Sequence, residues 1–411
     1  MKIAIIGGGA AGLMAAVAAL ETNPAAEIVL LEKNKTLGNK VLLTGGGRCN
    51  VTTGIDDVRT VLQRYPRGGK FLSSAMHRFP PSMMRSFFEA HGVPIKIEAD
   101  QRAFPVSEDG QDIVNVFRDT LQDSRVTILY EAAVERVEKR NLAYVLSLKD
   151  GRPAVIAERL ILATGGRAYR QTGSSGDGYT FAETFGHTIT SLHPSLSNLK
   201  LREKWPADLS GVSFERAEIR AADDKKMSQV GPFIFTHLGI SGPAVFALSA
   251  LVADRDFTPK NPLKLLIDLF PDEPPETTLA HFVVSIAEQR KRSFRNALAN
   301  FIPKSLATIA CRELNIDPCR NAAEISKKDL LRAATWLNAI PVNAVGRSAG
   351  EEFVTAGGVA LDEVNPSTME SKITPGLYFC GELLNIDGFT GGFNLSAAWA
   401  TGYLAGENAA K

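Results

Sequence analysis

The chain has 411 residues, of which 45% are hydrophobic and 22% charged, and its formal net charge is +1. This length allows two or three domains with buried cores, and the composition is that of an ordinary globular protein. The balanced charge gives no field that concentrates nucleic acid or an anionic membrane, so we expect a small-molecule substrate and neither a nucleic acid nor a membrane as partner.

Further classes are disfavoured by local patterns. No stretch reaches the roughly 20 apolar residues that a membrane-spanning helix needs, and a strand pattern stands where a signal sequence would begin, so we expect a cytoplasmic protein. The four cysteines form no Cys-x-x-Cys pair and no zinc-ligand spacing, which predicts reduced thiols and no metal site. A basic run of Arg290, Lys291, Arg292 and Arg295 is interpreted as a solvated helix face.

The first 32 residues carry a dinucleotide fingerprint. Lys2–Ile6 and Glu27–Leu31 are short apolar runs typical of buried strands, and the segment between them has a helical pattern. Gly7, Gly9 and Gly12 have the Gly-x-Gly-x-x-Gly spacing. In that motif the first glycine makes the turn, the second lets the backbone approach a pyrophosphate, and the third lets the helix pack closely on the strand.

The same motif predicts where the ends of the ligand lie. A phosphate would bind the N–H groups that open the helix, beside Ala10 and Ala11. Glu32 stands 20 residues beyond Gly12, which is the distance expected for a carboxylate that accepts hydrogen bonds from a ribose diol. The alternative is a plain packing turn, but strand, turn, helix, strand and acid together favour a bound dinucleotide.

A second glycine loop follows shortly afterwards, at Thr44-Gly45-Gly46-Gly47-Arg48-Cys49-Asn50. Three consecutive glycines can present successive N–H groups to an anion, and Arg48 adds a positive charge beside them. A flexible surface turn is the alternative, but the closeness of this loop to the fingerprint favours a role facing the cofactor. We expect Cys49 to be a small buried residue and not a nucleophile.

The next segments alternate between helical and strand patterns. Ile55 to Arg102 is predicted mostly helical, with apolar residues that form a core stripe. Val126–Tyr130, Ala133–Val137 and Leu142–Leu148 are predicted strands. Arg159–Leu162 is a further predicted strand.

That last strand ends in Ala163-Thr164-Gly165-Gly166, whose small residues would let the chain pass close to the dinucleotide at the carboxyl edge of the sheet. Asp177 is placed to cap a following helix that runs from about Tyr179 to Phe185.

The character of the chain changes near residue 191. Proline and glycine pairs punctuate short apolar runs there, which predicts a β-rich domain over 191–272. Helical spacing predicts a small helical insert over 273–339. We therefore expect the dinucleotide-binding domain to comprise 1–190 and 340–411, interrupted by these two parts.

The C-terminal segment returns to short strands with glycine ends, at 354–359 and 376–381. A strand that ends in Gly381-Glu382 aims a carboxylate at whatever lies over the sheet edge. Gly391 and Gly392 free the backbone at the start of a helix over Leu395–Leu404, whose dipole can stabilise negative charge.

Together these motifs resemble those of the bacterial BaiN-like NAD(P)/FAD-dependent oxidoreductases, which are related more distantly to the fumarate reductase and succinate dehydrogenase flavoproteins. The resemblance rests on GGGAAG at 7–12, TGGGRCNVT at 44–52, ATGG at 163–166, GSSGDGY at 173–179, FTHLGISGPA at 235–244, VTAGGV at 354–359 and GLYFCGELLNIDGFTGGFN at 376–394. It implies an α/β fold with a Rossmann-like FAD-binding domain, interrupted by a β-barrel-like domain and a small helical insert.

The resemblance also implies non-covalently bound FAD. Gly7–Gly12 and Glu32 would hold the ADP half, Arg48 and its glycine loop the pyrophosphate or flavin side, and Glu382 the ribitol. The residues expected to contact FAD are Gly7, Gly9, Ala10, Ala11, Gly12, Glu32, Lys33, Lys40, Thr44, Gly45, Gly46, Gly47, Arg48, Cys49, Asn50, Val134, Ala163, Thr164, Gly165, Gly381, Glu382, Asp387, Gly391, Gly392, Phe393 and Asn394.

The expected activity is that of a reductase that passes hydride from NAD(P)H through FAD to an unsaturated or carbonyl small molecule. Only one fingerprint is present, so NAD(P)H would dock transiently. His237, Arg347 and Arg167 are candidate proton donors or anion clamps, because each stands next to a glycine-rich turn. The alternatives are a flavin-dependent RNA-modifying enzyme and a non-catalytic FAD redox sensor.

Overall fold

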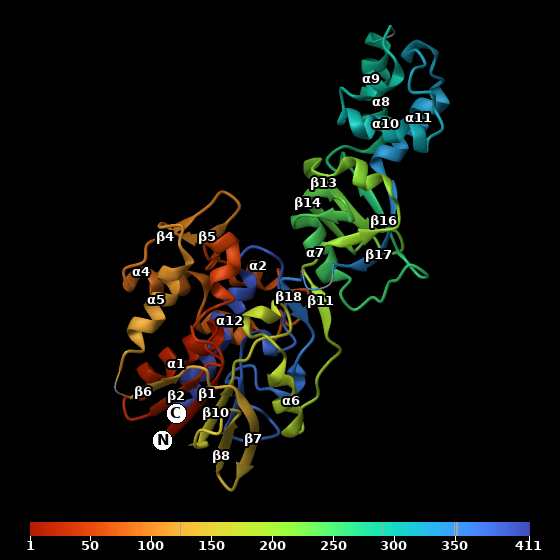
Figure 1. Cartoon of the computed structure of the whole chain (residues 1–411). Coiled ribbons are helices and arrows are strands. Elements are labelled where there is room, and N and C mark those ends of the chain that lie inside the picture. Colours follow the sequence, from red (N-terminus) through yellow and green to blue (C-terminus); the bar gives the residue numbers. More distant parts are fainter. Residues whose placement is uncertain (124, 290, 349, 351) are drawn as a thin grey trace. The chain divides into compact units, whose positions relative to one another are not determined.

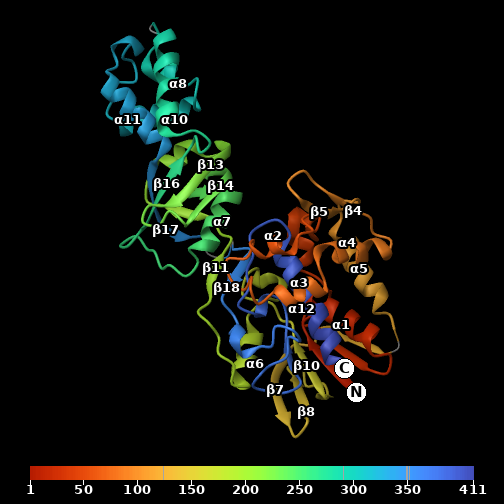
Figure 2. The same ribbon diagram turned by 180° about the vertical axis from the view of Figure 1, so that it is seen from behind.

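The computed structural model describes residues 1–123, 125–289, 291–348, 350 and 352–411 (Figures 1 and 2). The chain forms two compact units: unit 1 is Met1–Ser195 with Glu352–Lys411, and unit 2 is Leu196–Glu351. The sequence predicts divisions at 190 and 340 instead. Within the described ranges no helix has the length and apolar character to cross a membrane.

Unit 1 is built on a five-stranded parallel sheet with the strand order β19-β10-β1-β2-β6. The strands are β1 (Lys2–Ile6), β2 (Glu27–Leu31), β6 (Val126–Leu129), β10 (Arg159–Leu162) and β19 (Leu377–Phe379). In β1 the residues Ile3 to Ile6 are all buried. Strands buried on both faces read as continuous apolar runs, which is why the sequence predicts β1, β2 and β10 with these same bounds.

Two helices from opposite ends of the chain pack together in unit 1. Helix α1 (Ala10–Thr22) follows the first glycine turn, and α12 (Phe393–Ala409) lies against it, red beside blue in Figures 1 and 2. A Cβ atom at Gly402 would lie 2.3 Å from the carbonyl oxygen of Ala11, and one at Gly406 would lie 2.1 Å from that of Ala15. Glycine on α12 and alanine on α1 therefore allow the two backbones to approach closely.

The remaining elements of unit 1 surround this sheet. They are β3 (Thr52–Thr53), α2 (Val58–Leu62), α3 (Ser73–Arg78), α4 (Pro81–Ala90), β4 (Ile95–Ile97), β5 (Arg102–Pro105), α5 (Gly110–Thr120), β7 (Val134–Arg140), β8 (Ala143–Leu148), β9 (Val155–Ala157) and α6 (Asp177–Thr184). Short 3-10 turns occupy Val41–Gly47, Arg170–Thr172, Leu361–Glu363 and Gly381–Leu383.

Two local predictions are wrong in this region. The helical reading of 55–102 fails at its end, because Pro94 precedes β4, and β4 pairs with β5. Asp177 does not cap α6, because Gly176 with φ of 89° occupies the N-cap position and makes no side-chain hydrogen bond. Asp177 stands instead in the first helical turn, where a carboxylate also complements the helix dipole.

Unit 2 contains a closed six-stranded barrel with the order β12-β15-β14-β13-β16-β17. Its strands are β12 (Leu199–Leu201), β13 (Ser213–Ala221), β14 (Ser228–Thr236), β15 (Gly239–Ser241), β16 (Leu263–Asp268) and β17 (Ile340–Arg347), with 3-10 turns at Trp205–Leu209 and Ala322–Glu324. The helices are α7 (Pro243–Leu251), α8 (Pro275–Glu288), α9 (Phe294–Leu298), α10 (Lys304–Glu313) and α11 (Lys327–Asn338).

Helices α8 to α11 are inserted between two strands that pair directly, β16 and β17. The barrel is thus assembled from segments on both sides of the helical insert, and this confirms the predicted combination of a Rossmann-like sheet, a barrel and helices. Of the basic run, Arg290 lies outside the described residues. Lys291 and Arg292 lie between α8 and α9, and only Arg295 belongs to a helix, so the predicted helix face is wrong.

A two-stranded antiparallel ribbon belongs to unit 1 at the points where the chain leaves and re-enters it. It consists of β11 (His193–Ser195) and β18 (Val354–Ala356), with Ser195 opposite Val354. The hydroxyl of Ser195 donates to Oδ2 of Asp387 at 2.7 Å. The two passages of the chain between the units therefore start from neighbouring strands.

Candidate dinucleotide site

The three fingerprint glycines lie at the carboxyl end of β1 and meet three different surroundings. Gly7 has φ of 109°, and a Cβ there would lie 2.5 Å from the carbonyl oxygen of Ala163. A Cβ at Gly12 would lie 1.9 Å from the carbonyl oxygen of Gly7. A Cβ at Gly9, the N-cap of α1, would meet nothing within 4 Å. Gly7 and Gly12 are required by protein packing, whereas the space beside Gly9 is open.

Glu32 closes the second strand and is 6% exposed. Its Oε2 accepts the backbone N–H of Gly8 at 2.8 Å, and its Oε1 accepts the backbone N–H (2.8 Å) and the side-chain amide (2.6 Å) of Asn34. A carboxylate has about four acceptor positions. Glu32 is therefore fixed at the glycine turn and retains acceptor capacity for a ribose diol.

Lys33 follows Glu32 in the chain, and Val134 follows a residue that hydrogen bonds the backbone of Glu32. The ammonium of Lys33 is 3.0 Å from Oδ2 of Asp177, and it also hydrogen bonds the hydroxyl of Ser175. The backbone carbonyl of Glu32 accepts from the N–H of Ala132, two residues before Val134, which is 6% exposed at the start of β7. The structure thus brings three predicted residues from two parts of the sequence together.

The second glycine loop has left-handed backbone conformations at Gly45, Gly46 and Gly47, with φ of 60°, 71° and 97°. Cβ atoms at Gly46 and Gly47 would meet nothing within 4 Å. Their backbone faces open space, as a concavity for an anion requires. Thr44, at the start of the loop, donates its hydroxyl to the carbonyl of Val41 at 2.7 Å.

The positive charge of Arg48 is balanced within the protein. Its Nη1 lies 2.8 Å from a carboxylate oxygen of Glu98 and 3.0 Å from one of Glu108, and its guanidinium lies 3.8 Å from the ring centre of Phe104. These hydrogen bonds raise the pKa of Arg48. The structure therefore gives Arg48 protein partners, which the sequence did not reveal because both acids are distant in the chain.

Cys49 and Asn50 hold the loop in place. Burial of the Cys49 side chain raises its thiol pKa to about 12, so the thiolate is not populated at neutral pH. With its amide turned to satisfy both ends, Asn50 accepts the N–H of Gly392 at 2.9 Å and donates to the carbonyl of Thr52 at 3.1 Å. Asn50 thereby links the second glycine loop to the start of α12.

The C-terminal block turns tightly before α12. Gly391 and Gly392 have φ of 121° and 87°, and Gly392 is the N-cap. Asn394 bridges the N–H and the carbonyl of Gly388, each at 2.8 Å, and the carbonyl of Phe393 accepts the Tyr65 hydroxyl at 2.7 Å.

Asp387, in the same block, is fully buried and forms a two-point ion pair with Arg67 (2.5 and 2.6 Å). This pair attaches the block to the segment before α3.

The strand end Ala163-Thr164-Gly165-Gly166 meets Gly381-Glu382 at the sheet edge. Glu382 pairs with Lys40 at 2.6 Å and accepts the backbone N–H of Thr355 at 2.8 Å. Thr355 was not a predicted site residue. The sequence feature that could have indicated it is its position as the one polar residue in the otherwise apolar run VTAGGV.

The three candidate catalytic residues fall in different units. Arg167 is exposed in unit 1, and in the described part of the chain its guanidinium makes neither an ion pair nor a hydrogen bond. His237 is exposed in the turn between β14 and β15 of unit 2.

Arg347, also in unit 2, donates to the carbonyls of Val252 (2.7 Å), Ala253 (3.2 Å) and Arg255 (3.3 Å) beyond the end of α7. The structure brings Arg167 alone of the three into the unit that holds the glycine turns.

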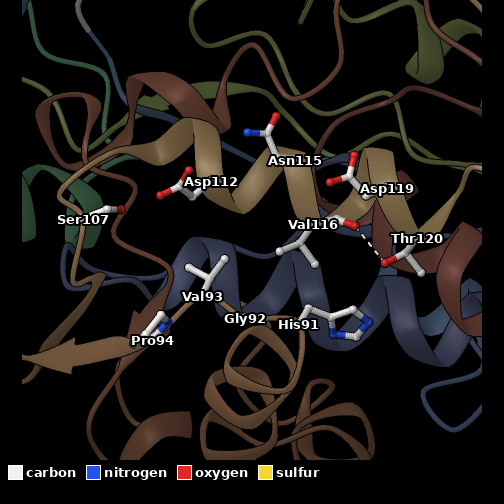
Figure 3. Close-up of a pocket in the computed structure, with 10 residues that line it drawn as sticks. All are labelled: His91, Gly92, Val93, Pro94, Ser107, Asp112, Asn115, Val116, Asp119 and Thr120. Carbon is white, nitrogen blue, oxygen red and sulfur yellow. Dashed lines mark hydrogen bonds between the residues drawn. The ribbon is translucent and has the colours of Figure 1, made fainter.

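A pocket of about 600 Å³ lies elsewhere in unit 1, between α5 and the turn that follows α4 (Figure 3). Asp112, Asn115 and Asp119 line it from one face of α5, and His91 lines it from the turn. None of the residues drawn in Figure 3 is a predicted cofactor or catalytic residue. The residues that line this pocket are therefore different from those of the glycine turns.

A parallel sheet with a glycine turn, a following helix and an acid after the second strand defines a dinucleotide-binding α/β protein. Two observations test whether a large dinucleotide fits it. The backbone is open at Gly9, Gly46 and Gly47, and within the described residues the hydroxyl of Thr164 is buried without a hydrogen-bond partner. The residues present fit a ligand that reaches from the first glycine turn to the second.

The chain belongs to the family described as HI0933-like protein Rossmann domain, whose model matches residues 1–408. A 3-dehydro-bile acid delta(4,6)-reductase from Clostridium scindens is 31% identical and aligns with 100% of this chain and 99% of that protein. A ribosomal RNA dihydrouridine synthase from Escherichia coli is 29% identical and aligns with 98% of this chain and 96% of that protein.

A solved structure of the Escherichia coli quinol fumarate reductase FrdA shares the fold, with a TM-score of 0.51 and 17% identity over 100% of this chain and 70% of that chain. These findings confirm the resemblance predicted from the motifs. The protein is a flavin-dependent oxidoreductase with an FAD-binding Rossmann domain.

Proposed function

We propose that this protein reduces a carbon–carbon double bond conjugated to a carbonyl group in a small molecule, with NAD(P)H as the hydride donor. The observation that carries the proposal is the full-length similarity to the Clostridium scindens protein named 3-dehydro-bile acid delta(4,6)-reductase. The open space at Gly9, Gly46 and Gly47 supports the proposal, because such a reductase needs a cofactor site and these turns would accommodate one.

The residues that would hold FAD follow the sheet edge. Gly9 and the N-terminus of α1 would take the pyrophosphate, Glu32 the adenosine ribose, and the backbone of Gly46 and Gly47 the far half. The Lys40–Glu382 pair would face the ribitol. When bound, FAD supplies the hydride chemistry, and the protein's task is to bind and orient the acceptor.

Arg167 is the residue we assign to the acceptor carbonyl. A conjugated double bond that accepts hydride develops negative charge on its carbonyl oxygen, and a guanidinium placed there stabilises that charge. Arg48 and Arg347 already donate to protein oxygens, whereas Arg167 has no such partner among the described residues.

The experiment uses the purified protein with its absorption spectrum recorded before and after anaerobic NADH or NADPH. A conjugated steroid dienone and its saturated ketone serve as acceptors, and mass spectrometry reports the addition of two hydrogens. We expect flavin bleaching followed by repeated turnover with the dienone only. Colourless protein that does not take up FAD, or bleaching without turnover on any acceptor, would refute the proposal, and the second result would indicate a redox sensor.

A second candidate acceptor is a uridine in RNA, which the Escherichia coli relative favours. The double bond of uracil is also conjugated to a carbonyl, so the chemistry is of the same class. The net charge of +1 argues against it, because RNA affinity at physiological salt depends on cationic contacts. Dihydrouridine formed in unmodified ribosomal RNA, with none formed from the dienone, would establish RNA as the substrate.

A further inference from the structure

The side chain of Thr355 anchors the loop that carries Arg167. Thr355 lies in β18, is 4% exposed, and its Oγ1 accepts the backbone N–H groups of Arg167 at 2.7 Å and Ala168 at 3.1 Å. A hydroxyl oxygen has two acceptor positions, and these two bonds fill both. The backbone of the loop is therefore fixed from β18, although nearly 190 residues separate the partners in the chain.

Gly166, Thr355 and Glu382 are tightly packed around this contact. A Cβ at Gly166 would lie 2.5 Å from Oγ1 of Thr355 and 2.7 Å from Oε1 of Glu382. The same Oε1 accepts the backbone N–H of Thr355, and the other carboxylate oxygen of Glu382 pairs with Lys40. Thr355 thus stands between the Arg167 loop on one side and the Lys40–Glu382 pair on the other.

The Arg167 side chain contrasts with its backbone. Its guanidinium has no ion pair or hydrogen bond in the described ranges, and its Nε packs against Gly176. A Cβ at Gly176 would lie 2.8 Å from Nε of Arg167. A side chain that binds a ligand through its charge needs a fixed backbone and a charged group that is free to contact the ligand.

We propose that Thr355 is a positioning residue that sets Arg167 for the acceptor through these two backbone hydrogen bonds. The proposal rests on the role given to Arg167 in the proposed function. Loss of the hydroxyl would free the loop and leave two N–H groups without an acceptor. A displacement of about 1 Å at a binding group can cost on the order of a hundredfold in rate, so the effect should be measurable.

The central comparison is between Thr355→Val, which removes the acceptor oxygen and nearly keeps the shape, and Thr355→Ser, which retains that oxygen. With the holoenzyme and the steroid dienone, we expect Thr355→Val to lower kcat/KM for the dienone by about tenfold or more while flavin bleaching by NAD(P)H keeps its rate. Thr355→Ser should behave as wild type. Thr278→Val is the matched control, because Thr278 in α8 of unit 2 is 2% exposed and its hydroxyl has no partner among the described residues.

A double-mutant cycle separates positioning from a general loss of structure. If Thr355 acts through Arg167, Thr355→Val should weaken binding of the saturated ketone in the wild-type background and add nothing in the Arg167→Ala background. An equal loss in both backgrounds would overturn the proposal, as would a Thr355→Val enzyme with unchanged kcat/KM and ketone affinity.

Hydrogen exchange of the wild-type holoenzyme tests the anchor without any variant or turnover. The amides of Arg167 and Ala168 should be protected to a similar degree as those of β10. Exchange at the rate of an open loop would overturn the inference even if the protein proves to be a reductase. Protected amides in a protein that reduces no acceptor would instead overturn the proposed function and, with it, the role of Thr355 in acceptor binding.

Discussion

Alanine substitutions at two fingerprint glycines should separate folding from cofactor binding. At Gly12 the new methyl group would lie 1.9 Å from the carbonyl oxygen of Gly7, a backbone atom that cannot move aside without distorting the turn. At Gly9 it would meet nothing within 4 Å, and the φ of −85° there is open to any residue. Gly12→Ala should therefore destabilise the apoprotein, whereas Gly9→Ala should block the ligand.

The magnitudes follow from the contacts. Overpacking of this kind costs about 1–3 kcal/mol, which for a unit of this size lowers the Tm by roughly 2–10 °C. Alanine is a poorer N-cap than glycine, so Gly9→Ala should cost less than about 1 kcal/mol in the apoprotein. Wild-type protein at a FAD concentration of about 100 Kd gains roughly 2.7 kcal/mol, and Gly9→Ala should lose nearly all of that gain.

Thermal unfolding of the apoproteins, with and without added FAD, measures both effects. The expected pattern is a low Tm for apo Gly12→Ala and a near-normal Tm for apo Gly9→Ala that FAD does not raise. An FAD-induced shift of wild-type size in Gly9→Ala would refute the assignment of that space to the pyrophosphate. An apo Tm of Gly9→Ala as low as that of Gly12→Ala would refute the claim that the space is open.

Three further predictions concern thiol exposure, pH dependence and a buried ion pair. The thiol of Cys319 is exposed, whereas the thiols of the other three cysteines are buried. A disulfide reagent should therefore modify one thiol per native chain, and none in Cys319→Ser. Fast modification of a second thiol would show a more open fold. Burial lowers the pKa of His187 below its ordinary 6.5, so the unfolded chain binds that proton first and the free energy of unfolding should fall as the pH drops below about 6.5. Urea unfolding at pH 7.5 and 5.5 should show a smaller fall in the free energy of unfolding for His187→Gln than for the wild type. An equal fall in both proteins would contradict this prediction. Arg67→Ala leaves the carboxylate of Asp387 buried without its cation and should lower the free energy of unfolding by about 3–5 kcal/mol. The double variant Arg67→Ala with Asp387→Asn should lose less. Equal stabilities of the single and double variants would argue that water solvates Asp387.

The parts of the fold that the sequence predicts best are those set by local patterns. Strands β1, β2 and β10 are continuous apolar runs between glycine and charged residues, and their observed bounds match the predicted ones. The terminal helix begins two residues before its predicted start, because Gly392 ends the turn at the N-cap. Where a short alternating segment follows a proline, as at Ile95–Ile97, the helical interpretation gave way to pairing with β5.

The parts that the sequence does not reveal depend on contacts between distant residues. Strand β17 closes the barrel against β12 and β16, although a whole helical insert separates it from β16 in the chain. The tertiary fold brings Arg48 into ion pairs with Glu98 and Glu108, and it places Asn50 where it accepts a hydrogen bond from Gly392. Residue type alone predicted a cation facing the ligand at Arg48, whereas the structure shows two carboxylates beside it; of Arg48, Arg167 and Arg347, Arg167 is the one whose guanidinium has no hydrogen bond or ion pair in the described ranges.

The pairing of β11 with β18 has a consequence for how the chain folds during its synthesis. The C-terminal helix α12, which lies against α1, is made only after all of unit 2, and at about 5–20 residues per second the intervening 156 residues take on the order of 10–30 s. The chain leaves unit 1 and re-enters it at neighbouring strands, and β12 and β17, the first and last strands of unit 2, pair with each other, so unit 2 can reach its own fold in that interval. The apolar surface of α1 stays uncovered during that interval, and we expect the nascent N-terminal half to bind a chaperone until α12 has been made and can pack against α1.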